Sequence, residues 1–258
     1  MNFEGGVKMS TSLLRHGNSY EAVYSNFKWN IPENYNIAYD VCDRWAEDQD
    51  RIALVYEDEL KNQKVFFFHE VKKYANQLAN LFTGLGLKKG DVVTLLLAQD
   101  PECAIAHVAC WKAGIISSPC SVLFASEAIK YRLNDCKTKI VITDEANYEK
   151  ISDIADDCPS LKKVILTNSK ANDTDNFWKL IKNEKTSFVN VNTKAEDVAW
   201  ISYTSGTTGM PKGSVQPHRM MLGHMPSLEF IYDFFPKEND ALWSPADWAW
   251  MAGLMDIL

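Results

Sequence analysis

Residues 204–213 combine side chains and glycines in a way that suits the binding of a polyphosphate. They read Thr-Ser-Gly-Thr-Thr-Gly-Met-Pro-Lys-Gly, with three glycines, four hydroxyl side chains and one lysine. Glycine lets the backbone approach an anion and adopt positive φ, and successive exposed N–H groups form an anion-binding concavity. The hydroxyls can donate further hydrogen bonds, and Lys212 supplies a positive charge. We therefore expect this segment to hold phosphate groups.

The spacing within this segment differs from that of the common phosphate loop of NTPases. That loop has four residues between its first glycine and the Gly-Lys-Ser/Thr ending. Here two residues separate Gly206 from Gly209, and Gly213 follows Lys212. An unrelated phosphate-binding NTPase is therefore disfavoured. A flexible surface loop is disfavoured as well, because an apolar strand is expected immediately before the segment, at 198–203.

The sequence also predicts the elements that must position this loop. Apolar runs indicate strands, and apolar residues at three- and four-residue steps indicate helices. The expected strands are 52–56, 65–68, 92–97, 115–118, 140–143, 163–166, 198–203 and 241–244. The expected helices are 37–47, 71–85, 101–113, 126–135 with Ser126 as its cap, 148–154, 218–230 and one from 248 onward. This alternation predicts an α/β fold, a doubly wound, mostly parallel sheet with flanking helices and right-handed crossovers.

The predicted domain organisation has three parts. Residues 1–35 are expected to be an irregular N-terminal extension, and 36–170 a first α/β subdomain that ends at the polar stretch 167–176. Residues 171–258 are expected to begin a second α/β subdomain that carries the phosphate loop. Residues 248–258 are apolar almost all round, as in a helix buried on every side. We therefore expect a truncated chain that lacks a C-terminal domain.

Composition and charge narrow the class of protein further. The chain has 258 residues, 46% of them hydrophobic and 24% charged, which is ordinary for a globular protein. With 27 basic and 34 acidic residues, a general nucleic-acid binder is disfavoured. The six cysteines form no C-x-x-C pair, so free thiols in a reducing cytosol are expected and no metal site is predicted. No signal peptide is visible and no apolar run approaches the ~20 residues that span a bilayer, so a cytoplasmic location is expected.

The loop is similar to a known motif. Residues 203–213, YTSGTTGMPKG, resemble the signature phosphate loop of the AMP-forming acyl-adenylate superfamily, the AMP-dependent synthetases and ligases, at every position. Residues 87–93 and 111–114 resemble two earlier blocks of the same family. Residues 244–250, SPADWAW, resemble the Trp-containing segment beside the acyl pocket of acyl-CoA synthetases. This last similarity favours the acetyl- or medium-chain acyl-CoA synthetase branch, and the resemblance runs from about residue 36 to the last residue.

The resemblance implies an incomplete N-terminal domain of an acyl-CoA synthetase-like fold and a two-step ligase reaction. A carboxylate attacks the α-phosphate of Mg-ATP to give acyl-AMP and pyrophosphate, and coenzyme A then displaces AMP, as in acetate or fatty acid metabolism. ATP, Mg²⁺ carried by its phosphates, coenzyme A and a small carboxylate are thus the implied ligands. The implied phosphate-binding residues are Thr204, Ser205, Thr207 and Thr208 as donors, Gly206 and Gly209 for close approach, and Lys212 for charge compensation. Trp248 is the candidate for the acyl pocket.

The family's adenine loop, ribose-binding aspartate, hinge and C-terminal lysine have no counterpart up to Leu258. Catalytic residues therefore stay unassigned, and the chain alone is expected to be inactive. The alternatives are a non-catalytic nucleotide-binding fragment and another adenylating enzyme, such as an aryl-acid or carrier-protein-loading ligase.

Other chemistry-bearing side chains are weaker candidates. His218 could be a catalytic base, but a structural residue near a helix start is favoured, and His107 is expected to be a core histidine. Trp248 either lines a pocket or packs, whereas Trp250 is expected to pack. Asp247 either orients its segment or caps the next helix, and capping is favoured.

Overall fold

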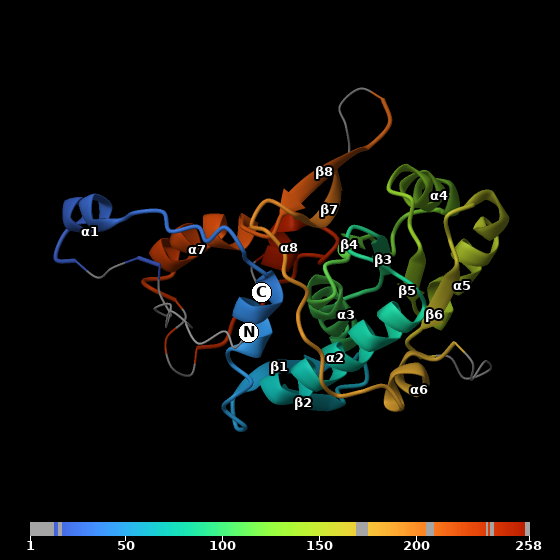
Figure 1. Ribbon diagram of the computed structural model, residues 1–258, viewed down its shortest axis with the longest axis horizontal. Coiled ribbons are helices and arrows are strands. Elements are labelled where there is room, and N and C mark those ends of the chain that lie inside the picture. The colour runs from blue at the N-terminus through green and yellow to red at the C-terminus, as the bar shows by residue number, and fades with distance from the viewer. Residues whose placement is uncertain are drawn as a thin grey trace.

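A six-stranded sheet forms the centre of the molecule (Figure 1). The computed structural model describes residues 13–14, 17–168, 175–204, 209–235, 237 and 240–255. The strand order is β6-β5-β3-β4-β7-β8, in which β3 to β7 are parallel and β8 is antiparallel to β7. The strands are β3 (Val92–Leu96), β4 (Ile116–Pro119), β5 (Ile140–Thr143), β6 (Lys163–Leu166), β7 (Val198–Thr204) and β8 (Lys212–Pro217). The predicted mostly parallel sheet is confirmed.

Helices cover both faces of this sheet. They are α2 (Phe68–Gly84) and α3 (Pro101–Lys112) on one face, and α4 (Ser126–Asp135) and α5 (Glu145–Ser152) on the other. Val93 and Leu95 of β3 belong to the apolar cluster under α2 and α3, whereas Leu96 belongs to the cluster under α4 and α5. Successive strand residues point to opposite faces, so β3 is buried from both sides. This confirms the doubly wound arrangement.

Smaller elements surround the sheet. They are α1 (Tyr20–Asn26), a π-helix (Tyr39–Asp43), the antiparallel pair β1 (Ile52–Glu57) and β2 (Gln63–Phe67), a 3-10 helix (Ala155–Asp157), α6 (Phe177–Lys182), α7 (Met220–Ile231) and α8 (Met251–Met255). The amide nitrogens of Asn76 and Gln77 donate to carbonyls of Thr186, Lys182 and Glu184, which ties α2 to the chain at and after α6.

Two buried charges tie together segments far apart in the sequence. Lys112, at the end of α3, is fully buried and donates to the carboxylate of Asp43 in the π-helix. Asn190 donates to the other oxygen of Asp43 at 2.8 Å and accepts from Lys112 at 3.3 Å. A buried charge needs such partners, because burial without them is very costly.

The sequence predicts an irregular N-terminal extension, but the extension contains a helix. Tyr20–Asn26 forms α1, which begins after Ser19, whose hydroxyl accepts from the Ala22 N–H at 3.2 Å. The extension contacts α7, since the N–H groups of Leu13 and Leu14 both donate to the carboxylate of Glu229 at 2.6 Å. Figure 1 shows α1 and α7 side by side, away from the sheet.

Some of the expected element positions are wrong. Residues 241–244 belong to no strand, and the last strand among the described residues is instead β8, Lys212–Pro217. Ser126 is the first residue of α4 rather than its cap, and Ala125 holds the cap position. The next helix begins at Glu145, earlier than expected, because the Asp144 carboxylate accepts from the Asn147 N–H at 2.7 Å and so starts α5.

The expected boundary near residue 170 does not interrupt the sheet. Trp200 of β7 pairs with Ser117 of β4, so the first strand of the second predicted subdomain extends the sheet of the first. The division into two subdomains stays a prediction.

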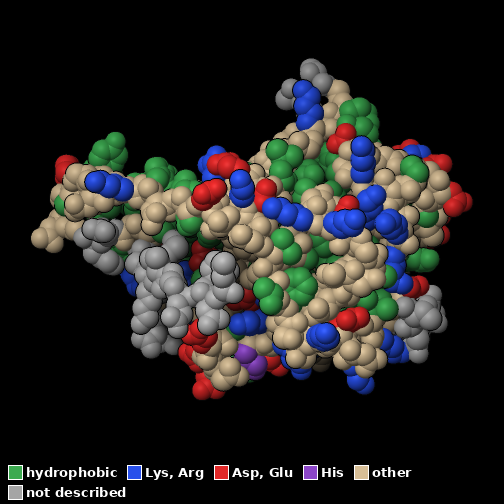
Figure 2. Space-filling model, viewed as in Figure 1, with side chains coloured by type: hydrophobic (Ala, Val, Ile, Leu, Met, Phe, Trp, Pro, Cys, Tyr) green, Lys and Arg blue, Asp and Glu red, His purple; other side chains and the backbone are tan. Residues whose placement is uncertain are grey.

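Charge is unevenly spread over the surface. On the face in Figure 2, Lys and Arg side chains gather across the middle, and Asp and Glu lie mostly nearer the periphery. The net charge of −7 therefore does not exclude an anionic substrate. Every helix among the residues described is too short or too polar to cross a membrane.

Candidate functional site

The hairpin of β7 and β8 brings together the two ends of the predicted phosphate loop. Thr204 and Lys212 are the last partners in its register, and the Thr204 hydroxyl lies 3.5 Å from the Lys212 carbonyl oxygen. Gly209 has φ of 109°, a conformation that favours glycine. The other four predicted residues, Ser205, Gly206, Thr207 and Thr208, lie outside the described residues.

This loop follows the carboxyl end of β7, at the edge where the parallel strands β3 and β4 also end. In open α/β sheets, ligands bind beyond the carboxyl ends of the strands, where the connections leave toward opposite faces. Here α3 follows β3 onto one face, and α4 follows β4 onto the other. The loop thus lies at the edge where a sheet of this topology binds ligands.

Helix α4 contacts both sides of the loop. The Tyr131 hydroxyl donates to the Pro211 carbonyl oxygen at 2.9 Å, near the end of the loop. The Tyr203 hydroxyl donates to Asp135 Oδ2 at 2.7 Å, before the loop. Burial and the Asp135 carboxylate both raise the pKa of Tyr203, so its hydroxyl keeps its proton and remains a donor.

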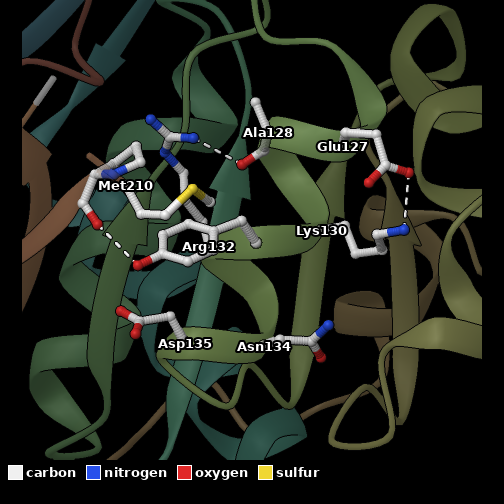
Figure 3. A pocket seen from close by; sticks show the side chains of 9 residues that line it. Glu127, Ala128, Lys130, Arg132, Asn134, Asp135 and Met210 are labelled. Atoms are coloured by element: carbon white, nitrogen blue, oxygen red, sulfur yellow. Dashed lines mark hydrogen bonds and ion pairs between the residues drawn. The ribbon is translucent and has the colours of Figure 1, made fainter. Parts of the chain in front are cut away.

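A groove of about 700 Å³ separates α4 from the chain before β8 (Figure 3). Its lining residues are Glu127, Ala128, Lys130, Tyr131, Arg132, Asn134, Asp135, Met210 and Pro211. The Arg132 guanidinium lies 4.0 Å from the centre of the Phe124 ring and donates to the Ala128 carbonyl at 2.7 Å. At the rim, Lys130 pairs with Glu127 at 2.7 Å. The groove therefore presents both charges, and Trp248 is not among its lining residues.

The segment 244–250 lies at the carboxyl ends of β3 and β4. Gln99, shortly after β3, donates through Nε2 to the carbonyls of Ser244 and Ala246 at 3.3 and 2.5 Å. Ser121, shortly after β4, donates to Asp247 Oδ2 at 2.7 Å, and Asp247 Oδ1 accepts from the Ala249 N–H at 2.9 Å. The Asp247 carboxylate thus orients its segment, but the favoured capping role is wrong, because it accepts from an N–H of the preceding turn and α8 begins only at Met251.

The two tryptophans of this segment differ in burial. Trp248 is 7% exposed and belongs to the larger apolar cluster, so packing is the role that its contacts show. Its place in an acyl pocket stays a prediction. Trp250 is 44% exposed, so the packing expected for it involves only part of its side chain. The turn fixed by Asp247, whose carbonyl accepts from the Trp250 N–H, directs only Trp248 into the core.

Both histidine candidates have structural surroundings. His218 is fully buried and its Nδ1 accepts from the Ile37 N–H at 3.2 Å. Burial lowers the pKa of His218 to about 4, and that of His107, which lies 3.0 Å from the Ser117 hydroxyl, to about 3. Both rings are therefore neutral near pH 7, in agreement with the structural roles favoured from the sequence.

Sequence reasoning missed Gln99, Ser121, Tyr131 and Asp135. Gln99 and Ser121 follow parallel strands closely, so the rule that ligands gather at the carboxyl edge could have selected them. Tyr131 and Asp135 are four residues apart on one helix face. Nothing in their types or spacing indicates that this face meets the loop.

Comparisons with known proteins agree with this geometry. The family model described as "AMP-binding enzyme" matches residues 42–258. Acetyl-coenzyme A synthetase of Rubrobacter xylanophilus is 27% identical over 246 residues, covering 88% of this chain and 38% of that protein. Mitochondrial acyl-coenzyme A synthetase ACSM3 of Homo sapiens is 28% identical over 249 residues, covering 93% and 42%. The chain thus spans about two fifths of the length of these curated relatives.

Solved structures show the same fold. The Brucella canis acyl-CoA synthetase superposes with a TM-score of 0.79 at 23% identity, over 92% of this chain and 44% of that one. The anthranilate CoA ligase AuaEII, in complex with anthranoyl-AMP, gives 0.69 at 24% identity over 75% and 37%. At such identities the likeness shows the fold alone. Since the family model covers most of the residues and includes the loop, the chain belongs to the AMP-binding enzyme family.

Proposed function

We propose that this chain is part of an AMP-forming acid–CoA ligase, which activates a carboxylic acid with ATP and transfers the acyl group to coenzyme A. The observation that carries the proposal is the β7–β8 hairpin, which joins Thr204 to Lys212 at the carboxyl edge of the sheet in a member of the AMP-binding family. The names of the relatives, acetyl- and acyl-coenzyme A synthetases, support the same reaction.

The phosphate loop would stabilise the charge that develops in the first step. A carboxylate oxygen attacks the α-phosphorus of Mg-ATP, the bond to the bridging oxygen breaks, and the negative charge moves onto pyrophosphate. Lys212, whose side chain is exposed at the loop, would offset that charge. The hydroxyls of Thr204, Ser205, Thr207 and Thr208 would donate to phosphate oxygens, and Gly206 and Gly209 would allow close approach. In the second step the thiol sulfur of coenzyme A attacks the acyl carbon, and AMP leaves.

The carboxylic acid would bind beside the segment 244–250. Gln99 and Ser121 hold this segment next to the ends of β3 and β4, at the sheet edge that β7 shares. Trp248 would contribute to the wall of the acyl site, which favours acetate or a medium-chain acid. In-line placement of the acid against ATP then contributes through proximity.

The larger protein would supply the rest of the enzyme. We propose residues 36–170 and 171–258 as successive α/β subdomains after the extension 1–35, completed by a C-terminal part of the same fold. A cytoplasmic location is also only proposed, because the relatives differ in compartment: human ACSM3 is named as mitochondrial.

Acid-dependent exchange between ATP and pyrophosphate tests the proposal on the protein at its natural length. A panel of acetate, butyrate, hexanoate and anthranilate should show exchange with at least one acid. Lys212→Ala should reduce the exchange rate about 100-fold, as expected for loss of one charge-stabilising group. Lys162→Ala, which removes an exposed lysine before β6, is the matched control and should leave the rate unchanged.

Binding separates the alternatives. The 258-residue chain should bind MgATP in calorimetry but should not catalyse exchange alone. Binding without exchange at natural length would support a non-catalytic nucleotide-binding protein. If the protein at its natural length neither binds MgATP nor catalyses exchange, the proposal is overturned.

A further inference from the structure

We propose that Tyr131 of α4 is a positioning residue for the phosphate loop, so that α4 sets the affinity for the polyphosphate of ATP. The inference rests on the proposed function, because it assumes that the loop binds phosphate. It adds a residue outside the loop motif to the machinery that holds the nucleotide.

The first step concerns the end of the loop, at residues 210–212. Tyr131 donates to the carbonyl of Pro211 at 2.9 Å. That carbonyl belongs to the peptide group that leads into Lys212, and proline offers no N–H of its own. The Tyr131 hydroxyl therefore fixes the peptide plane from which the Lys212 side chain projects. Met210 is 58% exposed, so its side chain does little to hold this part of the chain.

The second step concerns the residue before the loop. Tyr203 donates to Asp135 at 2.7 Å, four residues after Tyr131 on the same face of α4. The Tyr131 and Tyr203 rings meet edge to face, with centroids 6.5 Å apart at 76°. Arg132, which follows Tyr131 on α4, places its guanidinium 5.4 Å from the centre of the Tyr203 ring. One turn of α4 thus contacts both ends of the loop.

The third step is that α4 itself is firmly held. Ile129 and Leu133 are 0% and 1% exposed in the cluster between α4, α5 and the sheet. The Tyr131 hydroxyl therefore projects from a fixed support, on the side of α4 that faces the groove of Figure 3. A Lys212 backbone that is already fixed pays less conformational entropy when the lysine side chain binds its ligand. Loss of the hydroxyl should consequently weaken binding of the polyphosphate.

The test is Tyr131→Phe, which removes the hydroxyl and keeps the ring against Tyr203. The dissociation constant of MgATP, measured by calorimetry on the 258-residue chain, should rise by up to about tenfold, because the free energy of one hydrogen bond limits the ordering that the ligand must then supply. In the natural-length protein, the KM for ATP should rise similarly while the KM for the carboxylic acid stays unchanged. Without nucleotide, the melting temperature should fall by only about 2–4 °C, because a single part-buried hydrogen bond is lost.

The matched control is Tyr148→Phe. Tyr148 is 42% exposed on α5, which lies on the far side of α4 from β8 in Figure 1. This variant should bind MgATP like the unmodified chain.

The outcomes distinguish this inference from the proposed function. If the unmodified chain does not bind MgATP, the proposed function fails first. If the unmodified chain binds MgATP and Tyr131→Phe binds it equally well, the positioning role is wrong and the proposed function stands. If Tyr131→Phe raises the KM for ATP and the KM for the carboxylic acid to the same extent, the residue is merely structural and the inference is also overturned.

Discussion

Lys112 is held in an unfavourable place for a charge. Burial lowers the pKa of Lys112, and the adjacent Asp43 carboxylate acts in the opposite direction. Asn190 bonds both partners, so three segments depend on one polar cluster. A buried ion pair is weak evidence of net stabilisation, but removal of one partner leaves the other buried and uncompensated.

We predict that Asp43→Asn lowers the free energy of unfolding by about 3–5 kcal/mol. The asparagine cannot offset the charge on Lys112, which must either lose its proton or draw in water. Urea unfolding followed by tryptophan fluorescence measures the change. Glu127→Gln, which breaks an exposed pair with Lys130, is the matched control and should cost less than about 1 kcal/mol. Equal losses in the two variants would contradict the prediction.

Individual residues of the site were predictable only where the motif is local. Thr204 and Lys212 follow from the loop's composition, and the hairpin register brings them together. Tyr131 and Asp135 act through space on residues about 70 to 80 positions later. Such contacts depend on the tertiary fold, which carries no local signal in residue type or spacing.

Helix α8 packs directly on the backbone of the segment 244–250. A Cβ atom at Gly253 would lie 2.6 Å from the Asp247 carbonyl oxygen and 2.7 Å from that of Ala246. Both neighbours are main-chain atoms, which cannot move like the end of a side chain. The segment is thus confined between α8 and the hydrogen bonds from Gln99 and Ser121.

For these elements we predict opposite effects of the same substitution in two helices. Gly253→Ala should lower the free energy of unfolding by about 1–3 kcal/mol, because the added methyl group overpacks the contact. Gly223→Ala in α7 should raise it by about 0.5–1 kcal/mol, since its Cβ would meet no atom within 4 Å and alanine favours a helix. Thermal unfolding of both variants is the measurement. A neutral or stabilising effect of Gly253→Ala would show that α8 is not packed in this way.

Strands and helices of the sheet were predictable because their apolar patterns match their burial. All residues of β3 and β5 are buried, as continuous apolar runs indicate. In contrast, β8 contains Lys, Gly, Ser, Gln and Pro and is largely solvent-accessible, so it forms through its pairing with β7. The expected strand at 241–244 failed for the converse reason. Its apolar residues include Trp243, which is 80% exposed, and they have no adjacent strand.

Two buried histidines make the stability of the whole molecule depend on pH. Burial lowers the pKa of His218 to about 4 despite the opposing Asp197 carboxylate, and that of His107 to about 3, from an ordinary value of 6.5. Between these values the unfolded chain binds protons that the folded chain does not. The stabilisation is therefore complete above pH 6.5 and is lost as the pH falls toward 4.

We predict that His218→Asn reduces this dependence. Asparagine can still accept from the Ile37 N–H but cannot titrate, so about 3 kcal/mol of the change between pH 7 and pH 4 should disappear. Urea unfolding at a series of pH values measures the slope, and carboxylates contribute equally to both proteins. His224→Asn, at a partly exposed position on α7, is the control and should keep the original slope. Identical slopes for His218→Asn and the unmodified chain would contradict the prediction.

The continuous run from Ser121 to Asp135 touches both halves of the proposed site. Ser121 bonds the segment beside the proposed acyl site, and Tyr131 and Asp135 bond the two sides of the loop. Cys120, Phe124, Ile129 and Leu133 pack this run into one apolar cluster. This run therefore links the two proposed binding sites mechanically. A displacement of α4 would shift the site of the acid and the site of the phosphates together. A variant that weakens the packing of this run would therefore impair the alignment of the two reactants, even where each reactant still binds.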